Sequence, residues 1–170
     1  MVAWHPSETE EAAGRELSNL ELLAWRAMVV GTGRLVSKLD EQLQAEASLS
    51  LADYEILSYL SEAPGWHLRM TELAEGVVIS RSGLTRRVDG LVRRELVKRY
   101  ACESDRRGTY AQLTDAGFSV LKAAVPAHRA GVRRYFLDLL PDTSLPTMAD
   151  AMVSLASSLG MWPVGAAAFR

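Results

Sequence analysis

Residues 102–114, CESDRRGTYAQLT, place charged side chains at the tip of a turn between two runs of strand-forming residues. A carboxylate at Asp105 can pair with the guanidinium of Arg107 two positions later and hold it at one angle. Gly108 gives the returning backbone its freedom. Considered alone, the stretch is typical of a surface ion pair on a loop. If a DNA-binding helix precedes it in the chain, Arg106 and Arg107 could instead enter a minor groove.

The charge along the chain is unevenly divided. Residues 81–107 contain nine Lys or Arg and four acids, a balance of +5, whereas the net charge of the whole chain is −2. The other residues therefore carry −7. A basic block inside an acidic protein indicates a local site for a polyanion, although scattered charges on a solvated helix face are the alternative.

The elements before the hairpin predict a helix-turn-helix. A short helix is expected over residues 71–77 with Thr71 as its cap, and a second over 81–96 capped by Ser80. At about 100° per residue the second helix turns four apolar side chains to the core. These are Leu84, Val88, Leu91 and Val92.

The opposite face of this second helix is polar and basic, with Arg87 and Asp89 on its flanks. Its members could enter a major groove, and a hairpin that follows would act as a wing. The candidate DNA contacts of helix and hairpin together are Arg81, Ser82, Thr85, Arg86, Arg87, Arg93, Asp105, Arg106 and Arg107.

Long helical patterns flank this centre. Residues 16–46 and 145–159 carry more apolar positions, at three-four spacing, than a monomer needs to bury. A homodimer is the simplest cover for them. The predicted fold is therefore mainly α, a winged helix-turn-helix with long flanking helices that form a dimerisation domain.

The domain organisation follows from these elements. The sequence predicts a polar, disordered leader over 1–15, a DNA-binding lobe over 49–113 and a tail over 161–170. The helical dimerisation region is expected over 16–48 and 114–160. In the second of these segments Thr114 caps a helix to about residue 140, with a kink at Pro126.

The order of motifs from Arg69 onward resembles the MarR family of winged-helix transcription regulators. About 53 residues carry the resemblance, RMTELAEGVVISRSGLTRRVDGLVRRELVKRYACESDRRGTYAQLTDAGFSVL. Its most specific parts are the D-x-R wing at Asp105 and Arg107 and the LT-x-x-G motif at Leu113, Thr114 and Gly117. Glu95 departs from the pattern, because the family usually has glycine there.

The resemblance implies a dimeric repressor that binds a pseudo-palindromic operator in double-stranded DNA. It implies that Ser82, Thr85, Arg86 and Arg87 meet bases and phosphates and that Arg107, held by Asp105, enters the minor groove. It also implies release of the DNA by a small, often aromatic or anionic, effector.

Side chains that are mostly aromatic could line an effector cleft, although each of them is also consistent with ordinary packing, and His67 could equally be a solvent-exposed loop histidine. The candidates are Trp25, Met28, Tyr54, Trp66 and His67.

Other functions were weighed against DNA binding. Cys102 could make the protein a redox-responsive regulator, or it is a small packed strand residue. A winged-helix module that binds protein is a further alternative. No phosphate-binding loop, nucleophile elbow or metal spacing occurs, so neither an enzyme nor a cofactor is expected. A single cysteine and a polar start predict a cytoplasmic protein with no membrane partner.

Overall fold

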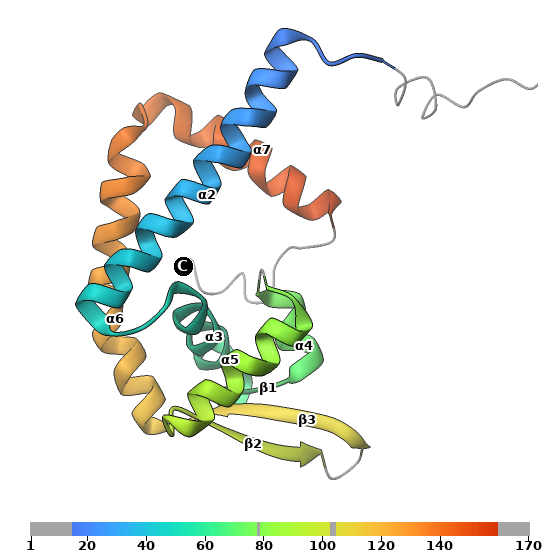
Figure 1. The fold of residues 1–170 in the computed structure, drawn as a ribbon, viewed down its shortest axis with the longest axis vertical. Helices are drawn as coiled ribbons and strands as arrows, with labels where there is room; N and C mark the ends of the chain where they lie inside the picture. The colour runs from blue at the N-terminus through green and yellow to red at the C-terminus, as the bar shows by residue number, and fades with distance from the viewer. Residues whose placement is uncertain (1–14, 78, 103–104, 160–170) are drawn as a thin grey trace, which may run out of the picture. The chain divides into compact units, whose positions relative to one another are not determined.

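The computed structural model describes residues 15–77, 79–102 and 105–159. They comprise two units, one up to Leu35 and one from Val36 onward, which are described separately. The helices are α2 (Asn19–Ala47), α3 (Leu51–Glu62), α4 (Met70–Gly76), α5 (Arg81–Arg93), α6 (Asp115–Tyr135) and α7 (Leu145–Ser158). The strands are β1 (His67–Arg69), β2 (Val97–Cys102) and β3 (Asp105–Leu113), and short 3₁₀ turns cover Pro64–Trp66, Leu137–Leu139 and Asp142–Ser144. The mainly helical winged-helix class is confirmed (Figure 1).

The first unit contains the start of α2, which begins later than the predicted residue 16. Ser18 and Glu21 form a reciprocal cap, since Ser18 N donates to Glu21 Oε2 at 2.7 Å and Glu21 N donates to Ser18 Oγ at 3.3 Å. Leu20, Leu23 and Trp25 of this helix are exposed by 75, 65 and 56%. The start of α2 therefore does leave large apolar side chains uncovered in a single chain, as the sequence predicted.

The core of the second unit is built from the apolar faces of α3, α4, α5 and α6. Ser50 caps α3, because its Oγ accepts from Asp53 N at 3.1 Å. The helices bury Leu57, Leu73 and Val88 completely. Further buried members are Leu43, Leu49, Ile56, Leu60, Leu84, Leu91, Val97, Leu113, Leu121 and Ala124.

Two local predictions need correction. The wing is a three-stranded antiparallel sheet in the order β1-β3-β2, whereas the sequence predicted two strands. Residues 67–69 are too few to show a period, and they become a strand only by pairing His67 to Gln112 across β3. Thr71 is not a cap, since α4 begins at Met70 and Arg69 N donates to Glu72 Oε2 at 2.9 Å.

The end of α5 is closed by a Schellman turn at the residue that departs from the family pattern. Glu95 N donates to Val92 O at 2.9 Å and Leu96 N donates to Leu91 O at 3.0 Å. Glu95 has a φ of 60°, in the left-handed region that favours glycine. The helix thus ends three residues earlier than expected, at Arg93, with strain stored at Glu95.

Replacing Glu95 by glycine should stabilise the protein by about 1 kcal/mol, or roughly 2–4 °C in melting temperature at fixed protein concentration. The substitution relieves the left-handed strain and removes a carboxylate from the negative end of the α5 dipole. Glu95→Ala is the matched control, because it removes the charge and keeps the strain. Equal melting temperatures for the two variants would show that the left-handed backbone at residue 95 does not lower the stability of the protein.

The LT-x-x-G motif joins the end of α5 to the start of α6. Thr114 Oγ1 accepts from Gly117 N at 2.9 Å and lies 2.9 Å from the carbonyl oxygen of Glu95, to which it donates. A Cβ at Gly117 would stand 2.1 Å from the carbonyl oxygen of Leu96. Only glycine permits so close an approach of α6 to the loop that ends α5.

Candidate nucleic-acid interface

The outer face of α5 is available for a partner. Ser80 starts the helix by accepting from Gly83 N at 3.1 Å, and the opposite face is buried at Leu84, Val88 and Leu91. The predicted contact residues of this helix are all exposed, namely Arg81, Ser82, Thr85, Arg86, Arg87 and Arg93. Burial of one stripe thus leaves a basic and hydroxylated stripe in solvent.

The flanks of α5 hold it in place. Asp89 Oδ1 accepts from Arg99 Nη1 of β2 at 2.6 Å, which ties one flank to the sheet. On the other flank Arg87 Nη1 donates to Ser50 Oγ at 2.7 Å. The helix wheel predicted both residues as flanking, but it gave no sign of either partner.

The wing hairpin extends beyond this helix (Figure 1). Strands β2 and β3 pair from Val97 opposite Leu113 to Cys102 opposite Asp105, with an irregularity between Ala101 and Cys102. The side chains of Cys102, Asp105, Arg106 and Arg107 lie outside the part of the chain that the structure describes. The Asp105–Arg107 pair and the redox role of Cys102 therefore stay predictions.

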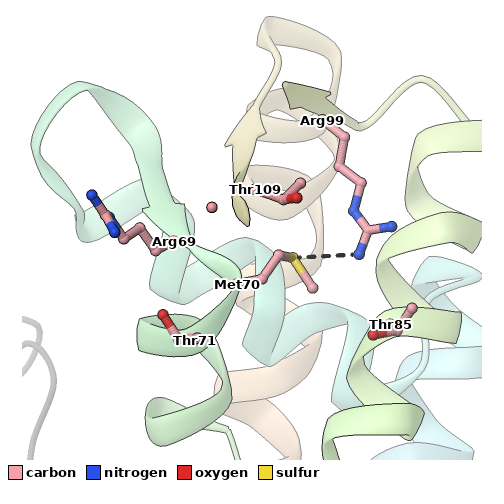
Figure 2. Close-up of a pocket in the computed structure, with 7 residues that line it drawn as sticks. Arg69, Met70, Thr71, Thr85, Arg99 and Thr109 are labelled. Atoms are coloured by element: carbon pink, nitrogen blue, oxygen red, sulfur yellow. Dashed lines mark hydrogen bonds between the residues drawn. The ribbon is translucent and has the colours of Figure 1, made fainter. Parts of the chain in front are cut away.

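A hollow of about 480 Å³ opens between the start of α4, α5 and the sheet. Figure 2 shows Arg99 reaching toward Met70, whose sulfur lies 3.6 Å from Arg99 Nη2. The hollow is lined by Arg69, Met70, Thr71, Thr85, Arg99, Gly108 and Thr109. Both arginines at this hollow already have partners, since Arg69 Nε donates to the Tyr110 hydroxyl at 3.1 Å and Arg99 Nη1 donates to Asp89 at 2.6 Å. Sequence reasoning missed this hollow, because its walls come from segments far apart in the chain.

The predicted effector residues do not line this hollow. Tyr54 stacks on His128 at 4.3 Å between ring centroids, and Trp66 stacks on Phe118 at 4.7 Å. Burial raises the pKa of the Tyr54 hydroxyl and lowers the pKa of His128. His67 instead meets the edge of Tyr110 at 5.3 Å.

Trp25 and Met28 belong to α2 in the first unit, Trp25 exposed and Met28 half-buried. Within the second unit the structure distributes Tyr54, Trp66 and His67 over separate aromatic contacts with α6 and the sheet.

The described ranges, 15–77, 79–102 and 105–159, contain neither a metal-binding cluster nor a membrane-spanning helix. No group of three or more His, Cys, Asp or Glu side chains there is arranged to hold a metal ion. No helix in those ranges has the length and apolar character needed to cross a membrane.

A helix-turn-helix preceded by one strand and followed by a hairpin that pairs with it in a three-stranded sheet, with a basic outer face on its second helix, defines a winged-helix protein of the DNA-binding type. The family model described as MarR family matches residues 47–108. Sco3205 from Streptomyces coelicolor, a MarR family transcriptional regulator solved in complex with DNA, is 37% identical, with a TM-score of 0.79 over 85% of this chain and 91% of that one. The chain belongs to the MarR family.

Two further comparisons agree with this assignment. AbsC, a MarR family transcriptional regulator from the same organism, is 38% identical, with a TM-score of 0.77 over 85% of this chain and 97% of that one. The HTH-type transcriptional regulator PecS of Dickeya dadantii is 29% identical over 107 residues, or 59% of this chain. The match spans only 64% of the length of PecS.

Proposed function

We propose that this protein is a transcription regulator that binds a specific sequence in double-stranded DNA. The outer face of α5 carries the proposal, because Arg81, Arg86 and Arg93 are exposed while the opposite stripe is buried. The helix would lie in the major groove, with Ser82, Thr85 and Arg86 at base edges. The wing would bring Arg107, held by Asp105 and beside Arg106, to the minor groove. The DNA complex of the similar Sco3205 supports this mode.

The test is selection of a duplex from a randomised library, followed by titration of that duplex and a scrambled copy at several salt concentrations. Affinity should fall steeply with salt, because phosphate contacts release counterions, and the selected duplex should bind about 10³-fold or more tightly than the scrambled one. Equal binding of both duplexes, or binding that ignores salt, would contradict the proposal. A partner interaction that ignores salt would instead favour a protein-binding module.

The active form is a homodimer in this proposal. Large apolar side chains remain exposed on α2 and on α7, among them Met152 at 43% and Leu155 at 40%. Exposed apolar rows of this kind are typical of a surface that another chain covers. Pairing two copies would also present two α5 helices to operator half-sites about 34 Å apart.

Changing Met152 and Leu155 together to glutamate should give monomers or insoluble protein, because two carboxylates would be desolvated in the apolar interface. Sedimentation velocity measures the outcome. The double change of Ser154 and Ser157 to glutamate, two neighbouring positions of α7, is the control for added charge. A well-folded dimer carrying both changes at Met152 and Leu155 would place the interface elsewhere.

The protein acts as a repressor in this proposal and leaves DNA when a small aromatic or anionic effector binds. Trp25 and Met28 of α2, and Tyr54, Trp66 and His67 of the second unit, remain the residues proposed for effector binding. Release of the selected duplex by a panel of aromatic carboxylates, followed by fluorescence anisotropy, tests the idea. Duplex that stays bound throughout the panel would argue against an effector of this class.

A further inference from the structure

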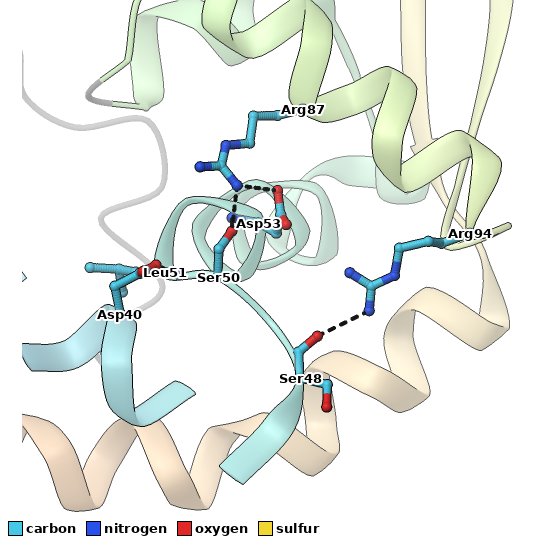
Figure 3. A network of polar contacts seen from close by, with 7 residues as sticks. All are labelled: Asp40, Ser48, Ser50, Leu51, Asp53, Arg87 and Arg94. Atoms are coloured by element: carbon cyan, nitrogen blue, oxygen red, sulfur yellow. Dashed lines mark hydrogen bonds and ion pairs between the residues drawn. The ribbon is translucent and has the colours of Figure 1, made fainter. Parts of the chain in front are cut away.

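The N-terminus of α3 is a junction of polar groups (Figure 3). Ser50, only 4% exposed, accepts from Asp53 N at 3.1 Å, and Asp40 Oδ1 of α2 accepts from Leu51 N at 2.8 Å. Two of the four N–H groups that a helix start leaves without an internal partner are thereby satisfied. The junction already joins the C-terminal part of α2 to α3.

Helix α5 reaches the same junction through two arginines. Arg87 Nη1 donates to Ser50 Oγ at 2.7 Å and lies 3.4 Å from Asp53 Oδ1. Arg94 Nη2 donates to the carbonyl oxygen of Ser48 at 3.3 Å. The two arginines are seven positions apart, two helical turns, so they share one flank of α5. Figure 3 shows both side chains extending from α5 toward the α2–α3 corner.

The arginines of α5 therefore form two parallel rows with different surroundings. Arg86 and Arg93 form the outer row, and both are exposed. Arg87 and Arg94 form the inward row, and both donate to the corner between α2 and α3. The two rows cannot be told apart by charge, because all four residues carry a guanidinium group. They differ in their partners within the protein.

We propose that Arg87 is a positioning residue, which fixes the orientation of α5 on the α2–α3 corner and does not contact DNA phosphate. The proposal rests on the proposed function and revises the DNA contact expected for Arg87. To reach DNA the guanidinium would leave a short charge-assisted bond to a buried oxygen and a neighbouring carboxylate. One nitrogen of the guanidinium is thus already engaged with the α2–α3 corner, although the side chain is 44% exposed.

The first experiment compares Arg87→Gln with Arg93→Gln, which removes the same charge from the exposed face of α5. The probe is the duplex selected by the wild-type protein from a randomised library. Arg87→Gln should weaken binding about 5–10-fold and leave the slope of log affinity against log salt unchanged, while Arg93→Gln should make that slope shallower by up to about one, because it removes a phosphate contact. A slope change of about one for Arg87→Gln would overturn the proposal.

Asp53→Asn separates positioning from competition. If Asp53 merely held Arg87 back from DNA, neutralising the carboxylate would free the guanidinium and tighten binding. The positioning role predicts weaker binding for Asp53→Asn, and no further loss when it is added to Arg87→Gln, because both act through one contact. Tighter binding of the Asp53→Asn protein would overturn the proposal.

A readout without DNA keeps this test distinct from that of the proposed function. Amide hydrogen exchange over residues 81–93 of the free protein should be faster in Arg87→Gln and unchanged in Arg86→Gln, because only the former loosens the helix. If no duplex were selected, the proposed function would fail while the exchange result still decided the positioning role. Equal exchange in the two variants would overturn that role.

Discussion

Replacing Gly117 by alanine should lower the free energy of unfolding by roughly 2–4 kcal/mol, toward the upper end of what overpacking a core costs. The added Cβ would stand 2.1 Å from the carbonyl oxygen of Leu96 and 2.7 Å from Leu113 Cδ1. The first of these atoms belongs to the backbone, so no rotamer change relieves the overlap. The start of α6 must move away from the loop that ends α5.

The measurement is chemical denaturation of both proteins at one concentration. Gly90→Ala is the matched control, because the nearest atom to its added Cβ is Arg93 Nη2 at 3.8 Å, an ordinary contact. Alanine inside α5 should therefore stabilise by about 0.5–1 kcal/mol. Similar stability changes for the two alanine variants would show that the close approach at Gly117 is not a constraint.

Replacing Arg86 by alanine should cost about 1–3 kcal/mol in operator binding and relax discrimination at one base position of each half-site. Arg86 projects from the middle of the exposed face of α5, where a guanidinium can donate two hydrogen bonds to guanine. Arg93 lies two turns further along, at the last residue of α5. A phosphate is the expected partner there, and phosphate contacts carry no base information.

Selection from a random operator library measures both effects. Arg86→Ala should return operators with one degenerate position, while Arg93→Ala should return the wild-type preference with weaker binding of every sequence and a shallower salt dependence. The two variants remove the same side chain from the same face, so each is the control for the other. An unchanged preference for Arg86→Ala, or a changed one for Arg93→Ala, would contradict this assignment of the face.

The elements nearest the proposed site were predictable because their signals are local. Ser80 and Thr114 cap their helices as predicted, each accepting from a backbone N–H, and the buried stripe of α5 follows the helical period. Caps and periods depend on residues within one or two turns, so the sequence contains them directly. The LT-x-x-G motif was recognisable as a pattern, but its reason, the contact of Gly117 with Leu96, spans two elements.

The sequence by itself determined the helix-turn-helix, the hairpin and the family, because each depends on neighbouring residues and their period. Only the tertiary structure decided which cations of α5 find a partner within the protein. Arg86 and Arg87 are adjacent and chemically identical, yet Arg87 lies against Ser50, 37 residues earlier in the chain. Strand β1 and the hollow beside Arg99 were decided in the same way. Each is made by segments that come into contact only when the chain folds, and the local propensity of a residue does not predict such long-range contacts.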